Sequence, residues 1–208
     1  MNLLDNFINE CDIALKTLSF KKSGTGRSYP VNETSSYLSK KEKSLSAQLM
    51  RVNLAGEVAA QALYRGQAMV CKDAEIKNHL VQAGEEETDH LIWCKKRLEE
   101  LNGKPSILNP VWYAGSFTIG AIFGSFGEKT SLGFVEETEK QVVKHLEKHL
   151  DKVSKNDTET IEILKTMRAD EDEHAQEAIE NGSESLSEPT KKVMSFTAKV
   201  MTSSSAYI

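Results

Sequence analysis

Two short stretches of the sequence combine acidic residues with a histidine. One reads EEETDH and ends at His90, and the other reads DEDEH and ends at His174. In each stretch a glutamate lies three positions before the histidine, Glu87 in the first and Glu171 in the second. Residues three positions apart lie on one face of an α-helix, one turn apart. Each Glu-x-x-His pair could therefore bind one metal ion through a carboxylate and an imidazole.

Both pairs interrupt apolar helical stripes. The first stripe follows steps of three and four residues through Leu80, Ala83, Glu87, His90, Leu91 and Cys94. The second stripe runs through Leu164, Met167, Glu171, His174, Ala175 and Ala178. Because such a stripe is the buried face of an amphipathic helix, we expect both pairs to face the core. Glu86 and Asp170 fall outside the stripes, and we expect Glu86 to face solvent.

Two further stripes each contain a single glutamate. Glu57 lies in a stripe with Met50, Leu54, Ala60 and Tyr64. Glu139 lies in a stripe with Leu132, Val135, Val142, Leu146 and Leu150. A lone ionised carboxylate is very costly to bury, so buried glutamates at these positions need partners. The alternative is that Glu57 and Glu139 tilt to the helix edge and that both histidines are satisfied core residues.

The four glutamates form a repeat along the chain. Glu57 precedes Glu87 by 30 residues, and Glu139 precedes Glu171 by 32, as a duplicated helix hairpin would give. One glutamate from each of two helices and a Glu-x-x-His from each of the other two form the ligand set of a ferritin-like carboxylate-bridged dimetal centre. Two divalent cations would cancel the four negative charges. Oxygen and nitrogen ligands without thiolate favour iron or manganese over structural zinc.

Long helices must position these residues. Six stretches have helical periodicity, at about 45–70, 73–102, 110–126, 130–154, 157–181 and 189–202. Long helices with short joints predict an all-α fold: a ferritin-like four-helix bundle with an additional apolar helix and a short C-terminal helix. We expect three segments: an N-terminal amphipathic helix and polar connector (1–44), the ferritin-like di-iron bundle (45–182) and a C-terminal amphipathic helix (183–208).

The composition narrows the class of function. The 208-residue chain has a formal net charge of −5, which argues against nucleic acid as a partner because phosphate binding needs a concentrated basic surface. Cys11, Cys71 and Cys94 are widely spaced and form no CxxC pair. This spacing predicts neither a disulfide framework nor a zinc knuckle, and a reducing cytoplasm fits best. The start, MNLLDNFINECDIALK, is acidic where a secretory signal needs an apolar run, and it predicts an amphipathic helix.

The stretch from Pro105 to Gly127 contains no charged residue and is rich in aromatic and branched side chains. Its length raises the question of a transmembrane helix, but polar residues and glycines dilute its apolarity. We favour attachment to a membrane surface, with a buried core helix as the alternative. Gly120 and Gly124 predict close packing against another helix. Residues 189–202 predict a small basic amphipathic helix that could lie on a bilayer or cover the bundle.

Four motifs surround the candidate ligands: RVNLAGEVAAQALYRGQ, EEETDHLIWC, GFVEETEKQVVKHL and DEDEHAQEA. Together they resemble the demethoxyubiquinone hydroxylases of ubiquinone biosynthesis, in the bacterial form, over nearly the whole chain from about residue 45. The resemblance implies a di-iron, membrane-peripheral monooxygenase. Such an enzyme uses O2 to hydroxylate the ring of a polyprenylated demethoxy-benzoquinol (3-demethoxyubiquinol).

The resemblance also implies roles for individual residues. The six iron ligands would be Glu57, Glu87, His90, Glu139, Glu171 and His174, with Glu87 and Glu171 bridging two iron ions. His145 matches a family position and would orient a ligand or the substrate, although six positions from Glu139 is not a same-face helical step. The family usually has a histidine where this chain has Leu54. Leu54 is not one of the six ligands, so this difference puts in doubt a contact next to the ligands but not the metal centre.

The implied substrate sets further expectations. A polyprenyl quinol reaches its site from the bilayer, so we expect peripheral attachment to the cytoplasmic face of the bacterial inner membrane through residues 110–126, with 189–202 as a second candidate. No GxGxxG loop follows a strand here, which argues against a built-in Rossmann nicotinamide site. We therefore expect an external electron donor, for which NADH is a candidate. Homo-oligomers and other ubiquinone-biosynthesis proteins are candidate partners. Two other functions stay open: a ferritin-like iron-oxidising storage protein and a non-enzymatic lipid-binding bundle.

Overall fold

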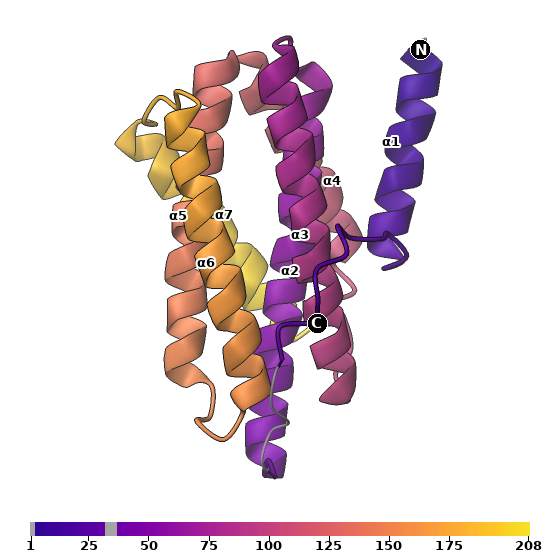
Figure 1. The fold of residues 1–208 in the computed structure, drawn as a ribbon, viewed down its shortest axis with the longest axis vertical. Helices are drawn as coiled ribbons and strands as arrows, with labels where there is room; N and C mark the ends of the chain where they lie inside the picture. Colours follow the sequence, from indigo (N-terminus) through magenta and orange to yellow (C-terminus); the bar gives the residue numbers. More distant parts are fainter. Residues whose placement is uncertain (1–2, 32–36) are drawn as a thin grey trace.

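The computed structural model describes residues 3–31 and 37–208, and within these ranges the chain is helical without any strand (Figure 1). The helices are α1 (Leu3–Leu18), α2 (Lys40–Val70), α3 (Ala74–Glu100), α4 (Asn109–Ser125), α5 (Glu128–Lys152), α6 (Thr158–Glu180) and α7 (Glu188–Ser205). The predicted all-α fold is therefore confirmed. Residues 1, 2 and 32–36 of the predicted N-terminal segment lie outside the described residues.

Side-chain caps fix where the helices of the bundle begin. Ser39 and Glu42 form a capping box, so α2 begins five residues before the predicted start at 45. Asp73 accepts hydrogen bonds from the first backbone N–H groups of α3, and Asp157 does so for α6. Because only a few residues separate α2 from α3 and α5 from α6, each pair forms an antiparallel hairpin.

The two hairpins form the four-helix bundle. α2 packs along α3, α5 packs along α6, and α3 faces α6 across the middle of the molecule (Figure 1). The core between them contains fully buried residues from all four helices, including Met50, Leu91, Leu146 and Leu164. The stripes predicted from the sequence are thus the inward faces of the bundle. The segment boundaries proposed at residues 44 and 182 stay predictions.

The apolar helix α4 lies along the outer side of α2 instead of inside the core. Only Asn109, Tyr113, Gly120 and Gly124 of this helix are buried, whereas Val111 and Ile122 are 58% and 47% exposed. A fully buried core helix, the alternative expectation for this segment, is therefore wrong. Among the described residues, no helix combines the length and the apolarity that crossing a membrane would require.

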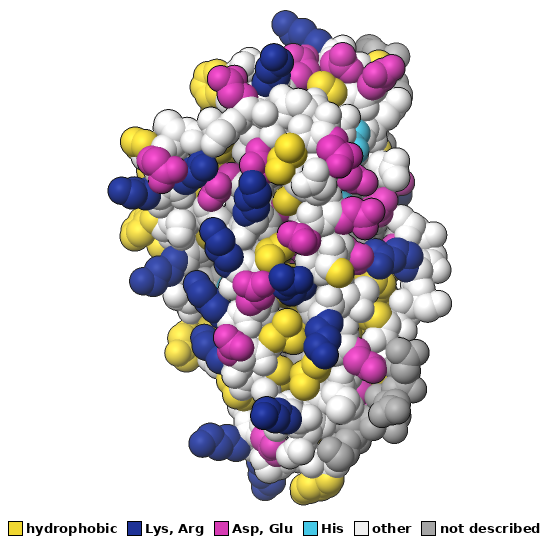
Figure 2. Space-filling view, turned by 60° about the vertical axis from the view of Figure 1, so that its left-hand side comes forward, with side chains coloured by type: hydrophobic (Ala, Val, Ile, Leu, Met, Phe, Trp, Pro, Cys, Tyr) yellow, Lys and Arg dark blue, Asp and Glu magenta, His cyan; other side chains and the backbone are white. Residues whose placement is uncertain are grey.

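The C-terminal helix α7 also leaves apolar side chains exposed. Val193 is 65% exposed and Phe196 69%, and Val200 follows them one turn later. The indole Nε1 of Trp112 on α4 donates a hydrogen bond of 3.0 Å to Ser205 Oγ, which joins the start of α4 to the end of α7. Figure 2 shows hydrophobic side chains along the left-hand edge of the molecule with lysine and arginine side chains among them.

Glycines allow the backbones of α2 and α4 to touch. A Cβ atom added to Gly66 would lie 2.1 Å from the carbonyl oxygen of Phe117, and one added to Gly120 would lie 2.2 Å from that of Leu63. No side chain fits at such distances, because the neighbouring atoms belong to helical backbone. The close packing predicted from Gly120 and Gly124 is confirmed.

Replacing Gly120 with alanine should separate α4 from α2. We expect Gly120→Ala to lower the free energy of unfolding by about 1–3 kcal/mol, the usual cost of overpacking. Gly115→Ala on the same helix is the matched control, since its Cβ would meet nothing within 4 Å. It should raise stability by up to about 1 kcal/mol through helix propensity alone. Urea unfolding of both variants measures the difference, and equal effects would contradict the backbone contact.

Candidate metal centre

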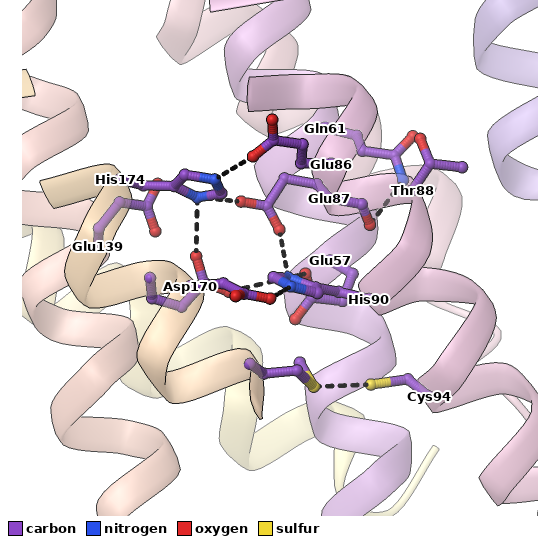
Figure 3. A network of polar contacts seen from close by, with 12 residues as sticks. Glu57, Gln61, Glu86, Glu87, Thr88, His90, Cys94, Glu139, Asp170 and His174 are labelled. Atoms are coloured by element: carbon purple, nitrogen blue, oxygen red, sulfur yellow. Dashed lines mark hydrogen bonds and ion pairs between the residues drawn. The ribbon is translucent and has the colours of Figure 1, made fainter. Parts of the chain in front are cut away.

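Six acidic and imidazole side chains converge inside the bundle (Figure 3). They come from four helices: Glu57 on α2, Glu87 and His90 on α3, Glu139 on α5, and Glu171 and His174 on α6. None is more than 4% exposed. The alternative in which Glu57 and Glu139 tilt to the helix edge is therefore wrong, because both carboxylates are buried.

The two Glu-x-x-His pairs meet across the bundle axis. Nδ1 of His90 lies 3.0 Å from Glu87 Oε2 and 3.1 Å from Glu171 Oε1. Nδ1 of His174 lies 3.3 Å from Glu87 Oε1 and 3.3 Å from Glu171 Oε2. Glu87 and Glu171 each direct one carboxylate oxygen toward each imidazole. A carboxylate placed in this way could bind two metal ions, one beside each imidazole.

The other two glutamates flank this centre on opposite sides. Glu57 Oε2 lies 3.8 Å from His90 Nδ1. Atoms of Glu57, Glu87, His90 and Glu171 that could bind a metal all lie within 4.8 Å of one another. Glu139 accepts a hydrogen bond of 2.8 Å from the hydroxyl of the buried Tyr64. Glu57 therefore adjoins His90, and Figure 3 shows Glu139 beside His174.

Burial and mutual repulsion disturb the ionisation of the cluster. Burial, together with Glu87 and Glu171, raises the pKa of Glu57 well above its usual value, and the pKa of Glu139 rises for the same reasons. Burial opposes ionisation of Glu87 as well, but the neighbouring imidazoles of His174 and His90 lower its pKa. The shifts of Glu57 and Glu139 thus oppose a full set of four negative charges in the cluster.

Metal ions fit this donor set better than protons do. Glu87 Oε1 is buried and has no well-aligned hydrogen-bond donor among the described residues, although His174 Nδ1 lies 3.3 Å away. Two divalent ions would satisfy this oxygen and neutralise four carboxylates. Cys94 is the nearby sulfur, but burial raises the pKa of its thiol and its Sγ contacts Met167 Sδ at 3.7 Å. The available ligands are therefore oxygen and nitrogen atoms.

A second acid supports each histidine from the facing helix. Nε2 of His90 lies 2.8 Å from Asp170 Oδ2, and Nε2 of His174 lies 3.0 Å from Glu86 Oε2. If Nε2 of each imidazole carries the proton and donates a hydrogen bond to the carboxylate, the lone pair of Nδ1 points into the cluster. Carboxylates in this position fix the tautomer and the ring orientation of metal-binding histidines.

The expectation that Glu86 faces solvent is wrong, because His174 holds its carboxylate at the rim of the cluster. Its side chain is 31% exposed and that of Asp170 16%. Sequence reasoning missed both acids because each lies beside the inward stripe of its own helix and reaches the histidine of another. One signal could have revealed them: an acid directly precedes the glutamate of both Glu-x-x-His pairs.

His145 lies beside His149 on α5, with ring centroids 4.0 Å apart. Burial, with smaller effects of Lys148 and Lys152, lowers the pKa of His145 to about 4. Its predicted role in orienting a ligand or the substrate stays a prediction. Leu54, where a histidine was expected from the resemblance, is fully buried in the apolar core one turn before Glu57.

Comparisons with known proteins show the family of this chain. A family model described as ubiquinone biosynthesis protein COQ7 matches residues 44–205. The chain belongs to the COQ7 family. It is 48% identical to a 3-demethoxyubiquinol 3-hydroxylase of Legionella pneumophila (strain Lens), over 100% of this chain and 98% of that protein. A protein of the same name from Nitrosococcus oceani is 46% identical with the same coverage, and one from Francisella philomiragia is 48% identical over 97% of this chain and 96% of its own.

Removal of the Glu86 carboxylate should weaken metal binding while the bundle stays folded. We expect Glu86→Ala to lower the affinity for divalent metal by about 10- to 100-fold, as loss of a carboxylate partner of a metal-binding histidine usually does. Glu85→Ala, at the exposed neighbouring position, is the control and should leave the affinity unchanged. Titration of the metal-free protein with Co²⁺ measures both. An affinity equal to that of the wild type in Glu86→Ala would contradict the proposed support of His174.

Proposed function

We propose that this protein is a di-iron monooxygenase that uses O2 to hydroxylate the ring of 3-demethoxyubiquinol in ubiquinone biosynthesis. The observation that carries the proposal is the buried cluster of four glutamates and two histidines in a chain that matches proteins named 3-demethoxyubiquinol 3-hydroxylase over its full length. Family membership supplies the substrate class. The cluster supplies a site that needs metal ions.

The proposed ligands are Glu57, Glu87, His90, Glu139, Glu171 and His174, with Glu87 and Glu171 bridging. Two iron ions bound there would supply the reduction of O2 and the transfer of one oxygen atom to the substrate ring. Electrons would come from an external donor, for which NADH is our candidate.

The surrounding residues prepare the site for this chemistry. Asp170 and Glu86 hold the two imidazoles with Nδ1 toward the cluster. Tyr64 donates a hydrogen bond from its hydroxyl to Glu139 and so fixes that carboxylate. The fully buried Leu54 and Met167 pack in the same core and limit the access of water. A dry site of this kind protects reactive species from side reactions.

Measurement of iron and of product tests the function. We expect the purified protein to bind about two iron ions per chain and to add one hydroxyl group to demethoxyubiquinol, detected by mass spectrometry. Glu87→Ala and Glu171→Ala should each lower the turnover by at least about 100-fold, since each removes a bridge on which both metal positions depend. Glu85→Ala serves as the exposed control. Full activity in Glu171→Ala would refute the di-iron assignment.

The same preparation separates the alternatives. A storage protein would assemble into a closed cage and oxidise iron in bulk, far beyond two ions per chain. A non-enzymatic lipid-binding bundle would keep its function in both variants. The full-length identity to hydroxylases favours the enzyme over either alternative.

We further propose that the protein attaches peripherally to the cytoplasmic face of the bacterial inner membrane. The exposed apolar residues of α4 and α7, including Val111, Ile122 and Phe196, support this attachment, because a polyprenyl substrate resides in the bilayer. Homo-oligomers and contacts with other proteins of the pathway stay predictions.

Binding to lipid vesicles tests the attachment. The double variant Val193→Ser, Phe196→Ser removes two side chains that are 65% and 69% exposed, so it should fold normally. Loss of two such contacts should reduce partitioning into vesicles by at least about tenfold, given about 1.5–3 kcal/mol for each large apolar side chain that is fully buried. Ile179→Ser on α6, at a residue that is 41% exposed, is the control. Equal vesicle flotation of all three proteins would exclude attachment through α7.

A further inference from the structure

The segment of residues 20–31, which we call the strap, leaves α1 and runs along α3 (Figure 1). It lies outside residues 44–205, which match the family model. Thr25 donates hydrogen bonds to Asp89 through its backbone N–H (3.3 Å) and its hydroxyl. Further along, the hydroxyl of Tyr29 donates to Glu100 (3.2 Å). The strap is therefore bound to α3 at Thr25 and again at Tyr29.

The strap approaches α3 very closely at Gly24. A Cβ added to Gly24 would lie 2.0 Å from Asp89 Oδ1, so no larger residue fits there without displacement of the aspartate. Asp89, Trp93, Lys96 and Glu100 recur at steps of four, three and four residues and form one face of α3. The strap covers this face, and Lys96 Nζ lies 3.7 Å from the ring centroid of Tyr29.

Between Thr25 and Tyr29, Arg27 connects the strap to α6. Its guanidinium donates two hydrogen bonds to Asp170, of 2.7 Å to Oδ2 and 3.1 Å to Oδ1, and lies 5.0 Å above the ring of Trp93. The same Oδ2 atom contacts His90 Nε2 at 2.8 Å. A continuous chain of contacts thus runs from Arg27 through Asp170 to the imidazole that faces the cluster.

The other half of the centre lacks an equivalent bidentate partner among the described residues. Glu86, which supports His174, accepts a hydrogen bond of 3.2 Å from the Gln82 amide. An amide makes one neutral contact, whereas a guanidinium makes two parallel charge-assisted bonds in a fixed plane. The two pseudo-symmetric halves therefore differ in the partner that holds the supporting acid.

We propose that Arg27 is a positioning residue that acts through Asp170 on His90, so that the Arg27–Asp170 contact sets the metal affinity of the His90 half of the centre. This inference rests on the proposed metal centre. The physical basis is preorganisation: the guanidinium fixes the carboxylate, the carboxylate fixes the ring, and Nδ1 is directed into the cluster before metal binds. On charge alone, removal of a nearby cation would favour metal binding. A fall in affinity therefore distinguishes positioning from electrostatics.

Titration of the metal-free, full-length protein with Co²⁺ under anaerobic conditions tests the proposal, with visible absorption as the readout. The wild type should bind two Co²⁺ per chain. Arg27→Lys keeps the charge and removes the planar fork, and Arg27→Gln removes both. In each variant we expect one of the two binding steps to weaken by about three- to tenfold, less than the 10- to 100-fold loss typical of a direct partner. The other step should stay within about twofold of the wild type.

Two further variants test whether Arg27 acts on His90 through Asp170. Thr25→Val loosens the strap at Asp89 but keeps the Arg27–Asp170 contact, so both Co²⁺ steps should equal those of the wild type. In an Asp170→Asn background, Arg27→Gln should have no additional effect if Arg27 acts only through Asp170.

The outcomes separate the proposals. Wild-type affinities in both Arg27 variants would overturn the positioning role, as would an equal effect of Thr25→Val or an additive effect in the Asp170→Asn background. A rise in affinity would assign Arg27 an electrostatic role instead. Absence of Co²⁺ binding by the wild type would overturn the metal centre itself, and with it this inference.

Discussion

The structure depends on the placement of four carboxylates in a core from which water is excluded. Glu57, Glu87, Glu139 and Glu171 are each no more than 4% exposed. Ionised groups lose the solvation of water on burial, so the cluster must bind cations or protons. The pKa of Glu57 and that of Glu139 are raised because the apolar surroundings and the neighbouring carboxylates oppose a further negative charge. The four helices must therefore hold these groups together against both desolvation and repulsion.

The supporting residues show how the helices do so. Each Glu-x-x-His helix places its glutamate between the two imidazoles and extends the preceding acid to the histidine of the facing helix. The result is a pair of reciprocal contacts between α3 and α6, the two helices that carry most of the ligands. The same residues that would bind metal therefore also fix the distance between the two hairpins.

The sequence predicted the helices and the six converging residues because both follow from periodicity. A glutamate such as Glu139 in an apolar stripe can be recognised within one helix, without knowledge of its neighbours. Glu86 and Asp170 could not be recognised in this way, since their function depends on a residue of another helix. Arg27 lies in a polar connector without periodicity, and only the path of the chain in space brings it to Asp170. The exposure of α4 likewise could not be predicted, because the sequence of an apolar helix does not show whether the helix is buried or lies at a surface.

The contact between α2 and α4 has a mechanical consequence. At Gly66 and Gly120 the two helices meet backbone to backbone, with no flexible side chain between them to absorb a displacement. α2 carries Glu57 at the cluster, whereas α4 presents Val111 and Ile122 outward. A tilt of α4 would therefore also displace α2, since no flexible side chain lies between the two backbones. The exposed surface of α4 is in this way coupled to the helix that carries Glu57.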